Sequence, residues 1–197
     1  MAQVKKIEVR DAILESAFDL FARQGYARTT LAQIAAGARV TPSNIYVYFG
    51  SKLDLLFEVY RPWLMERLDA LDVRLAGIAD PKERLRALLY AVWRDLPQDD
   101  NGFANNLMQA VSNLDPSDRY SRDLLDSCER RVSTMLRTCL PPERQALADD
   151  RNILAHILFM AQDGLVISYK LNGPVRRMDA MVDAMVDAMC ALLIASG

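Results

Sequence analysis

The chain has 197 residues, of which 51% are hydrophobic, and its formal net charge is −2. A chain of this length and composition can bury a substantial core, so we expect a globular protein of one or two domains. The N-terminus lacks the apolar stretch of an export signal, and polar residues interrupt the most apolar segment, residues 153–169, so neither export nor a membrane span is expected. The three cysteines show no metal-ligand spacing and are expected to be reduced thiols in the cytoplasm. The sequence predicts no metal, cofactor or membrane partner.

Hydrophobic periodicity predicts an all-α fold of about nine helices, without a strand. The first helix is expected over residues 8–24, because Ile13, Ala17 and Phe21 recur on one face and Gly25 follows as a stop.

Two short helices separated by a tight turn are predicted by the segment that begins at Thr30, TLAQIAAGARVTPSNIYVYFGSK. Thr30 and Gln33 form a capping box, which predicts that a helix begins at Leu31. Thr41 is expected to cap the second helix, with Pro42 at its first position.

The second short helix is expected to end at about Tyr48, with Ile45 and Phe49 pointing inward. Four polar or aromatic side chains then remain outside: Ser43, Asn44, Tyr46 and Tyr48. Short polar side chains at the N-terminus of a helix suit the major groove of DNA, so the two helices are interpreted as a helix-turn-helix.

A fourth helix is expected to begin at a Ser51 cap, which places Lys52 where it could meet a phosphate. Pro62 is expected to kink or break this helix, and the domain boundary is placed there, giving domains 1–61 and 62–197. Residues 1–61 hold eight Lys or Arg and six Asp or Glu, a weak electrostatic footprint for DNA binding. Affinity must therefore come from the local placement of a few cations: Lys5, Lys6, Arg28, Arg39 and Lys52.

Proline and capping signals divide the rest of the chain into further helices. They are expected over residues 81–95, 103–114, 116–140, 149–171 and 175–195, with acid-proline starts at Asp80 and Asp115. The last two are joined by a short Asn-Gly-Pro turn and should form an antiparallel hairpin.

The last helix contains a near-repeat, MDAMVDAMVDAM, in which acids recur every four residues at Asp179, Asp183 and Asp187. The acids must face water or meet cations such as Lys170, Arg176 or Arg177. The remaining apolar band is too wide for one neighbouring helix to cover. It is therefore predicted to form a dimer interface, the alternative being an internal core helix; the interface residues are Val182, Met185, Val186 and Met189.

Asp163 interrupts an otherwise apolar helix and shares a face with His156 and Met160. Such a carboxylate needs a partner, either in a ligand pocket or in a dimer contact, and Gly164 beside it would let a partner helix approach. Apolar and polar side chains that could line a ligand pocket, or simply form core, are Trp63, Trp93, Phe103, Asn106, Met108, Tyr120, Met135, His156, Phe159, Met160 and Asp163.

Four linked signals in the first 60 residues resemble the TetR (tetracycline-repressor-like) family of transcriptional regulators: LFARQGY ending a helix, then TT with IA, then Val-Thr, then IYVYFGSK. The resemblance implies an N-terminal three-helix DNA-binding domain and a C-terminal helical domain that binds an effector and dimerises as a four-helix bundle. One departure is Arg39, at a turn position that is usually Gly in the family; positive φ there costs a non-Gly residue on the order of 1 kcal/mol.

From these features we expect a homodimeric transcriptional regulator, most simply a repressor. It should bind a palindromic operator and be released from it by a small-molecule effector. The residues expected to contact DNA are Thr30, Arg39, Thr41, Pro42, Ser43, Asn44, Tyr46, Tyr48 and Lys52. Catalysis is not expected, because His156 is the only histidine and no nucleophile or phosphate-loop motif accompanies it. The alternatives are a DNA-binding dimer without an effector and a helical dimeric interaction module.

Overall fold

The computed structural model describes residues 2–98, 102–114, 120–149, 151, 153–172 and 178–194. These residues form helices, turns and connections without a strand, which confirms the all-α prediction. None of the helices described is both long and apolar enough to cross a membrane.

The chain divides into two compact units, residues 1–64 with 101–124 and residues 65–100 with 125–197. The sequence predicted domains that divide after residue 61, and this remains a prediction. The compact units differ from it, because the first unit also includes residues 101–124.

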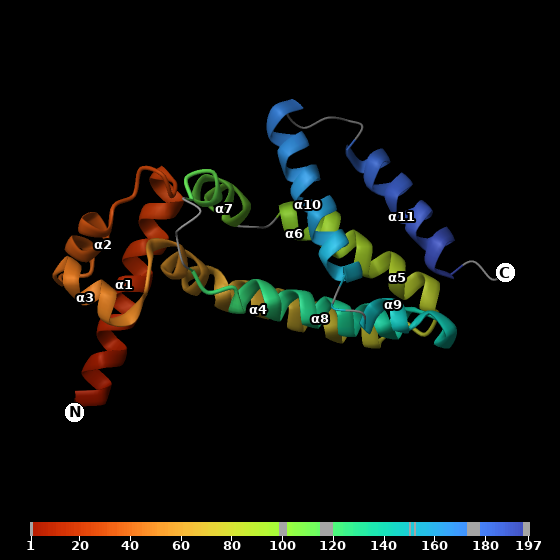
Figure 1. Cartoon of the computed structure of the whole chain (residues 1–197), viewed down its shortest axis with the longest axis horizontal. Helices are drawn as coiled ribbons and strands as arrows, with labels where there is room; N and C mark the ends of the chain where they lie inside the picture. The colour runs from red at the N-terminus through yellow and green to blue at the C-terminus, as the bar shows by residue number, and fades with distance from the viewer. Residues whose placement is uncertain are drawn as a thin grey trace. The chain divides into compact units, whose positions relative to one another are not determined.

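The first unit contains α1 (Ala2–Gln24), α2 (Leu31–Gly37), α3 (Pro42–Tyr48), the N-terminal half of α4 (Lys52–Ala76) and α7 (Phe103–Val111) (Figure 1). Helix α1 begins six residues earlier than expected. Apolar side chains from all of these helices except α7 pack into one core: Ile13, Phe21, Ile34, Ile45, Leu53, Leu56 and Tyr60 are all at most 3% exposed. This core fixes α2 and α3 against α1 and α4.

Local capping signals set the ends of the short helices. The Thr30 side chain accepts from the Gln33 backbone N–H and the Gln33 side chain accepts from the Thr30 N–H, so the predicted capping box is confirmed. Pro42 occupies the first turn of α3, and Thr41 stands at the N-cap position as predicted, but the Thr41 side chain makes no bond to the α3 backbone. The Ser51 hydroxyl accepts from the Asp54 N–H, as expected of a cap for α4.

A kink or a break was expected at Pro62, and the break does not occur, because helix α4 continues through this residue. The proline side chain is exposed, and Tyr60 and Leu64 on either side of it are buried. Proline removes one backbone donor, but packing of its neighbours holds the helix together.

The second unit contains the remainder of α4, then α5 (Pro81–Tyr90), a π-helical turn η1 (Ala91–Asp95), α6 (Leu96–Gln98), most of α8 (Asp123–Cys139), a 3-10 turn η2 (Pro142–Arg144), α9 (Ala146–Asp149), α10 (Ile153–Asn172) and α11 (Met178–Ile194). Figure 1 shows α10 and α11 lying over α5 and η1, in agreement with their contacts. Helix α8 begins at Asp123, seven residues later than predicted, and its expected Asp115 start lies outside the described residues.

The acidic stripe of α11 faces α5. The Arg86 guanidinium pairs with Asp187, and the Tyr90 hydroxyl, one turn further along α5, donates to Asp183. These pairs run antiparallel at four-residue spacing on both helices, so each helix turn carries one contact. The cations suggested from the sequence, Lys170, Arg176 and Arg177, have side chains outside the described residues. The α5 helix supplies the partners instead.

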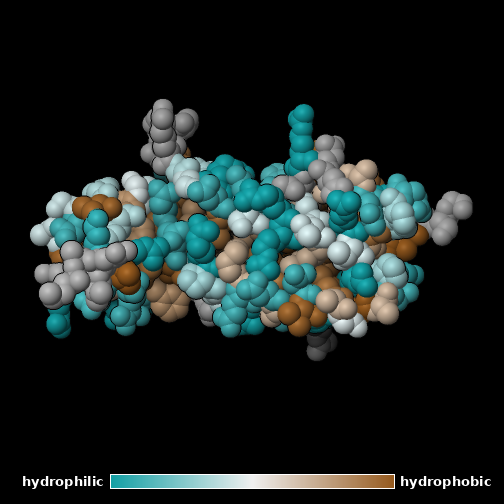
Figure 2. Space-filling view, turned by 90° about the horizontal axis from the view of Figure 1, so that it is seen from below, coloured by the Kyte–Doolittle hydropathy of each residue, from teal (hydrophilic) through white to brown (hydrophobic). Residues whose placement is uncertain are grey.

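All three cysteines, Cys128, Cys139 and Cys190, are buried free thiols. Burial raises the pKa of Cys139 to about 11, so this thiol stays protonated at neutral pH. At the surface, hydrophilic residues cover most of the face drawn in Figure 2, with smaller hydrophobic patches between them.

Candidate DNA-binding surface

Helix α3 presents one neutral face to solvent. Ile45 and Phe49 are 1% and 4% exposed and anchor the opposite face in the core, as predicted. Tyr46 is 61% exposed, and Val47 beside it is 67% exposed. Val47 was not among the expected contact residues, because an apolar side chain reads as core; an exposed methyl group can instead contact a thymine methyl.

Three polar side chains form a network at the N-terminus of α3. The Thr41 hydroxyl lies 2.8 Å from the Ser43 hydroxyl and donates to Asn44 Oδ1 at 2.7 Å. These bonds orient the Asn44 amide, and no bond to its Nδ2 is found among the residues that the structure describes. Its two N–H groups and the second lone pair of Oδ1 match the pattern that an adenine presents in the major groove.

The remaining α3 and α2 residues expected at DNA lie around this network. Pro42 is exposed at the start of α3, and Thr30 is exposed at the start of α2 with its hydroxyl used in the capping box. Tyr48 is half-buried and its ring centroid lies 6.3 Å from that of Phe49. Tyr48 is therefore the least accessible of the expected α3 contacts.

Lys52 holds the turn between α1 and α2. Its Nζ donates to the carbonyl oxygens of Tyr26 and Thr29, at 2.9 and 2.8 Å, and lies 4.0 Å from the centroid of the Tyr26 ring. Burial lowers the pKa of the Lys52 ammonium, a cost that these three contacts oppose. Since an ammonium has three N–H donors, one is left for the predicted phosphate contact.

Cations flank α3 rather than lying on it. Arg39, in the turn before α3, and Lys6 and Arg28 are exposed, whereas the Lys5 side chain lies outside the described residues. Arg10 is already paired with Glu58 at 2.6 Å. A neutral face between exposed cations is compatible with sequence-specific binding, in which base contacts and phosphate contacts are made by different side chains.

In the first unit, the residues expected to line a ligand pocket are Trp63, Phe103, Asn106, Met108 and Tyr120. The centroid of the Phe103 ring lies 5.0 Å from the centroid of the Tyr60 ring and 6.4 Å from that of the Trp63 ring. The Trp63 Nε1 is buried and has no acceptor among the residues described. Asn106 is buried, and both its side-chain oxygen and its side-chain nitrogen have hydrogen-bond partners within the chain.

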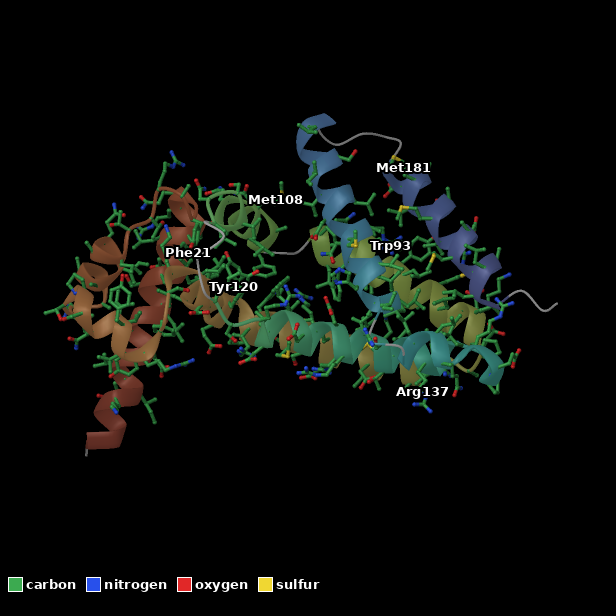
Figure 3. All side chains as sticks on the ribbon, in the orientation of Figure 1. Phe21, Trp93, Met108, Tyr120, Arg137 and Met181 are labelled. Carbon is green, nitrogen blue, oxygen red and sulfur yellow. The ribbon has the colours of Figure 1, made fainter. Side chains whose placement is uncertain are left out.

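In the second unit, Trp93, labelled in Figure 3, and Met135 are buried. The Trp93 Nε1 donates to the Leu158 carbonyl at 3.0 Å. His156 bonds Glu129 at 2.8 Å, and its side chain is 54% exposed. Phe159 is half-buried, and Met160 and Asp163 are exposed. Partial desolvation raises the pKa of Asp163, and nearby His156 opposes this shift.

The outer face of α10 carries an apolar seam. Ile153, Ile157, Met160, Ile167 and Leu171 are 43–79% exposed, and Gly164 lies in the same seam with no atom within 4 Å of an added Cβ. Their spacing alternates between four and three residues, the spacing of helices that pack side by side. Asp163 and His156 lie along one edge of this seam.

A matching seam on α11 carries Met181, Met185, Ala188 and Leu192, of which Met181 is 45% and Leu192 69% exposed. Val182 and Val186, by contrast, are 1% and 0% exposed within the single chain. They pack against the chain's own core, while Met185 and Met189 are half-buried. The two valines expected at a dimer interface therefore already have intramolecular partners.

The helix-turn-helix region has well-matched relatives. The family model described as "Bacterial regulatory proteins, tetR family" matches residues 13–59. The HTH-type transcriptional regulator HbdR of Aromatoleum sp. (strain CIB) is 40% identical over 86 residues, which cover 44% of this chain and 36% of HbdR. The HTH-type transcriptional regulator BetI of Rhizobium meliloti (strain 1021) is 29% identical over 195 residues, which cover 95% of this chain and 91% of BetI.

A solved structure extends the similarity over both units. A transcriptional regulator from Saccharomonospora viridis in complex with choline is 26% identical, with a TM-score of 0.62 over 96% of this chain and 99% of that chain. The chain belongs to the TetR family. As a TetR-family transcriptional regulator it is a DNA-binding protein, and α2 and α3 are its helix-turn-helix.

In this TetR-family protein the turn residue Arg39 has φ +56°, in the left-handed region that favours glycine. Arg39→Gly is therefore expected to raise the free energy of unfolding by about 1 kcal/mol, measured by urea denaturation. Arg39→Ala is the matched control, because it removes the same charge and keeps the strained backbone. Equal stability of the two variants would show that the turn is not strained.

Proposed function

We propose that the chain is a homodimeric transcriptional repressor that binds a palindromic operator and is released by a small-molecule effector. Sequence-specific DNA binding is supported by the neutral, exposed face of α3, where the network of Thr41, Ser43 and Asn44 lies between flanking cations. Thr41, Ser43, Asn44 and Tyr46 are assigned to base edges and adjacent phosphates, and Thr30, Tyr48 and Lys52 to the backbone. Such a protein acts in the cytoplasm, where the operator is.

The apolar seams of α10 and α11 support the homodimer. Two copies related by a two-fold axis would place four helices side by side, with the seams buried between them. On α11 the contacts are assigned to the seam residues Met181, Met185, Ala188 and Leu192 and to the neighbouring Met189, because Val182 and Val186 are buried in the single chain. A dimer of this kind presents two recognition helices to half-sites about one DNA turn apart, roughly 34–36 Å.

Two observations support a small-molecule effector. The Saccharomonospora viridis regulator, similar along nearly its whole length, was solved with choline. In this chain, the buried Trp63 N–H has no acceptor among the residues described, and such a donor costs about 1–3 kcal/mol that a ligand acceptor would recover. Trp63 and Phe103 are also aromatic faces of the kind that hold quaternary ammonium groups. Choline is therefore the first effector to test.

Selection of bound sequences from random DNA tests the proposal. We expect an inverted repeat, bound by a dimer in a gel shift and released by the effector. Release by choline, but not by ethanolamine at the same concentration, would support a quaternary ammonium effector. A selected operator that no compound releases would favour the alternative of a DNA-binding dimer without an effector. Failure to select any sequence would favour a helical interaction module.

Asn44→Ala is expected to relax discrimination at one position of the operator by about 1–3 kcal/mol, because the exposed Asn44 amide, held by Thr41, is assigned to a base edge. The dependence of affinity on salt should be nearly unchanged, since no phosphate contact is lost. Binding to operators with each base at each position provides the measurement. If Asn44→Ala weakens all of these operators equally, Asn44 does not read a base.

A further inference from the structure

The turn between α1 and α2, residues 25–29, leads directly into the Thr30 cap of the helix-turn-helix. Two of its backbone N–H groups, those of Tyr26 and Ala27, are held by α7. Asn106 Oδ1 accepts from the Tyr26 N–H at 2.7 Å, and Gln109 Oε1 accepts from the Ala27 N–H at 2.9 Å. The carbonyl side of the same turn is held by Lys52. Two helices distant in sequence therefore fix this turn from both sides.

Asn106 is the more deeply placed of the two amides. It is 1% exposed, and its Nδ2 donates to the Tyr60 hydroxyl of α4 at 3.1 Å and to the Phe21 carbonyl of α1 at 3.5 Å. A single side chain thus joins α1, the turn and α4 to α7. A buried amide with these bonds made has one orientation, because any rotation leaves donors and acceptors unpaired.

Gln109 packs against the turn at Gly25. A Cβ added to Gly25 would lie 2.8 Å from Gln109 Oε1, and Gly25 has φ +80°. The positive φ favours glycine here, and any larger residue would also push the end of the Gln109 side chain away from the turn. An open recess of about 390 Å³, lined by residues that include Gly25, Asn106 and Gln109, borders these bonds. Water can thus reach the turn once an acceptor is removed.

We propose that Asn106 and Gln109 are positioning residues for DNA binding, through which α7 sets the turn and hence the placement of α2 and α3. The proposal rests on DNA binding by α2 and α3, but neither residue is itself at the DNA-reading face. The turn is competent for DNA binding when both N–H groups are held. Apparent affinity falls with the fraction of molecules in that state.

Gln109 provides the sharper test, because its side chain is half-buried and uses the amide oxygen toward the turn. Gln109→Leu removes the acceptor at similar volume, whereas Gln109→Glu keeps an acceptor for the Ala27 N–H. We expect Gln109→Leu to weaken operator affinity about two- to tenfold, the fold-change for losing one hydrogen bond. Gln109→Glu should bind better than Gln109→Leu in 0.3 M salt, where the added charge is screened.

Hydrogen exchange measured by NMR reports directly whether the N–H groups of Tyr26 and Ala27 are held by α7. The Ala27 amide should exchange faster in Gln109→Leu and remain protected in Gln109→Glu. Val111→Ala is the matched control, since Val111 is 48% exposed on the same helix, and it should change neither exchange nor affinity. Asn106→Leu should make the Tyr26 amide exchange faster as well. If this buried substitution unfolds the first unit, the comparison of Gln109→Leu with Gln109→Glu still tests the proposal.

Two results would overturn the proposal. The Ala27 amide could remain protected in Gln109→Leu, which would mean that α7 does not hold the turn. Alternatively, the amide could open while operator affinity matched that of the wild type, which would mean that the turn does not position α2 and α3. A wild-type protein that selects no DNA sequence would instead remove the proposed function on which the inference rests.

Discussion

Lys52→Met is expected to lower the free energy of unfolding by about 2–4 kcal/mol, because hydrogen bonds from a charged donor contribute about 1.5–3 kcal/mol each. Methionine keeps the apolar stem of lysine but leaves the Tyr26 and Thr29 carbonyls without their donor. The interaction of the ammonium with the Tyr26 ring is lost as well. Urea denaturation followed by circular dichroism measures the loss.

DNA binding by Lys52→Met is expected to weaken for every sequence alike. The turn loses its carbonyl-side partner, and if the third N–H contacts a phosphate, the slope of log affinity against log salt falls in magnitude by about 0.9. Lys6→Met is the matched control, since Lys6 is an exposed lysine of α1, and it should change stability by less than about 0.5 kcal/mol. Equal stability of the two variants would show that the Lys52 bonds contribute little.

The helix-turn-helix could be predicted from the sequence because its signals are local. The Thr30–Gln33 box and Pro42 at the start of α3 are each decided within four residues, and the structure has both. The inward positions of Ile45 and Phe49 follow from helical spacing alone. Thr41 takes the N-cap position, but its hydroxyl bonds the Ser43 and Asn44 side chains instead of the α3 backbone.

Contacts distant in sequence could not be predicted. Nothing local to Asn106 indicates that it bonds Tyr26, 80 residues away, nor does the sequence at Lys52 point to the carbonyl groups of Tyr26 and Thr29. The helix does not break at Pro62, because Tyr60 and Leu64 on either side of it are buried in the core. Packing with other parts of the chain decided these features.

The apolar band of α11 shows the same limit. Periodicity predicted that the band is too wide for one neighbour, and the structure divides it between an inner face with Val182 and Val186 and an outer face with Met181 and Leu192. Valine and methionine are both apolar, so composition alone does not tell which of them faces the chain's own core. The acids lie on the side of α11 that faces α5, where Asp187 pairs with Arg86 and Asp183 accepts from Tyr90.

Val186→Asp is therefore expected to unfold the second unit, because it buries an unpaired carboxylate at a position that is 0% exposed. A test of the dimer needs a residue that is exposed in the single chain. Met160 meets this condition, since it is 60% exposed near the middle of the α10 seam, one helical turn from Gly164.

Met160→Asp is expected to weaken dimerisation by about 3–5 kcal/mol, more than a hundredfold, because it places an uncompensated charge inside the interface and next to Asp163. The monomer should keep its fold and lose specific DNA binding, since one half-site provides only part of the contacts. Val73→Asp is the matched control, as Val73 is 76% exposed on α4, away from both seams.

Size-exclusion chromatography with light scattering distinguishes the outcomes. We expect the wild type and Val73→Asp to elute as dimers at micromolar concentration and Met160→Asp to elute as a monomer with an unchanged circular dichroism spectrum. If Met160→Asp stays dimeric, the α10 seam lies outside the interface. A wild-type monomer at this concentration would remove the homodimer and, with it, the palindromic operator, because two-fold symmetry in the DNA site follows from two-fold symmetry in the protein.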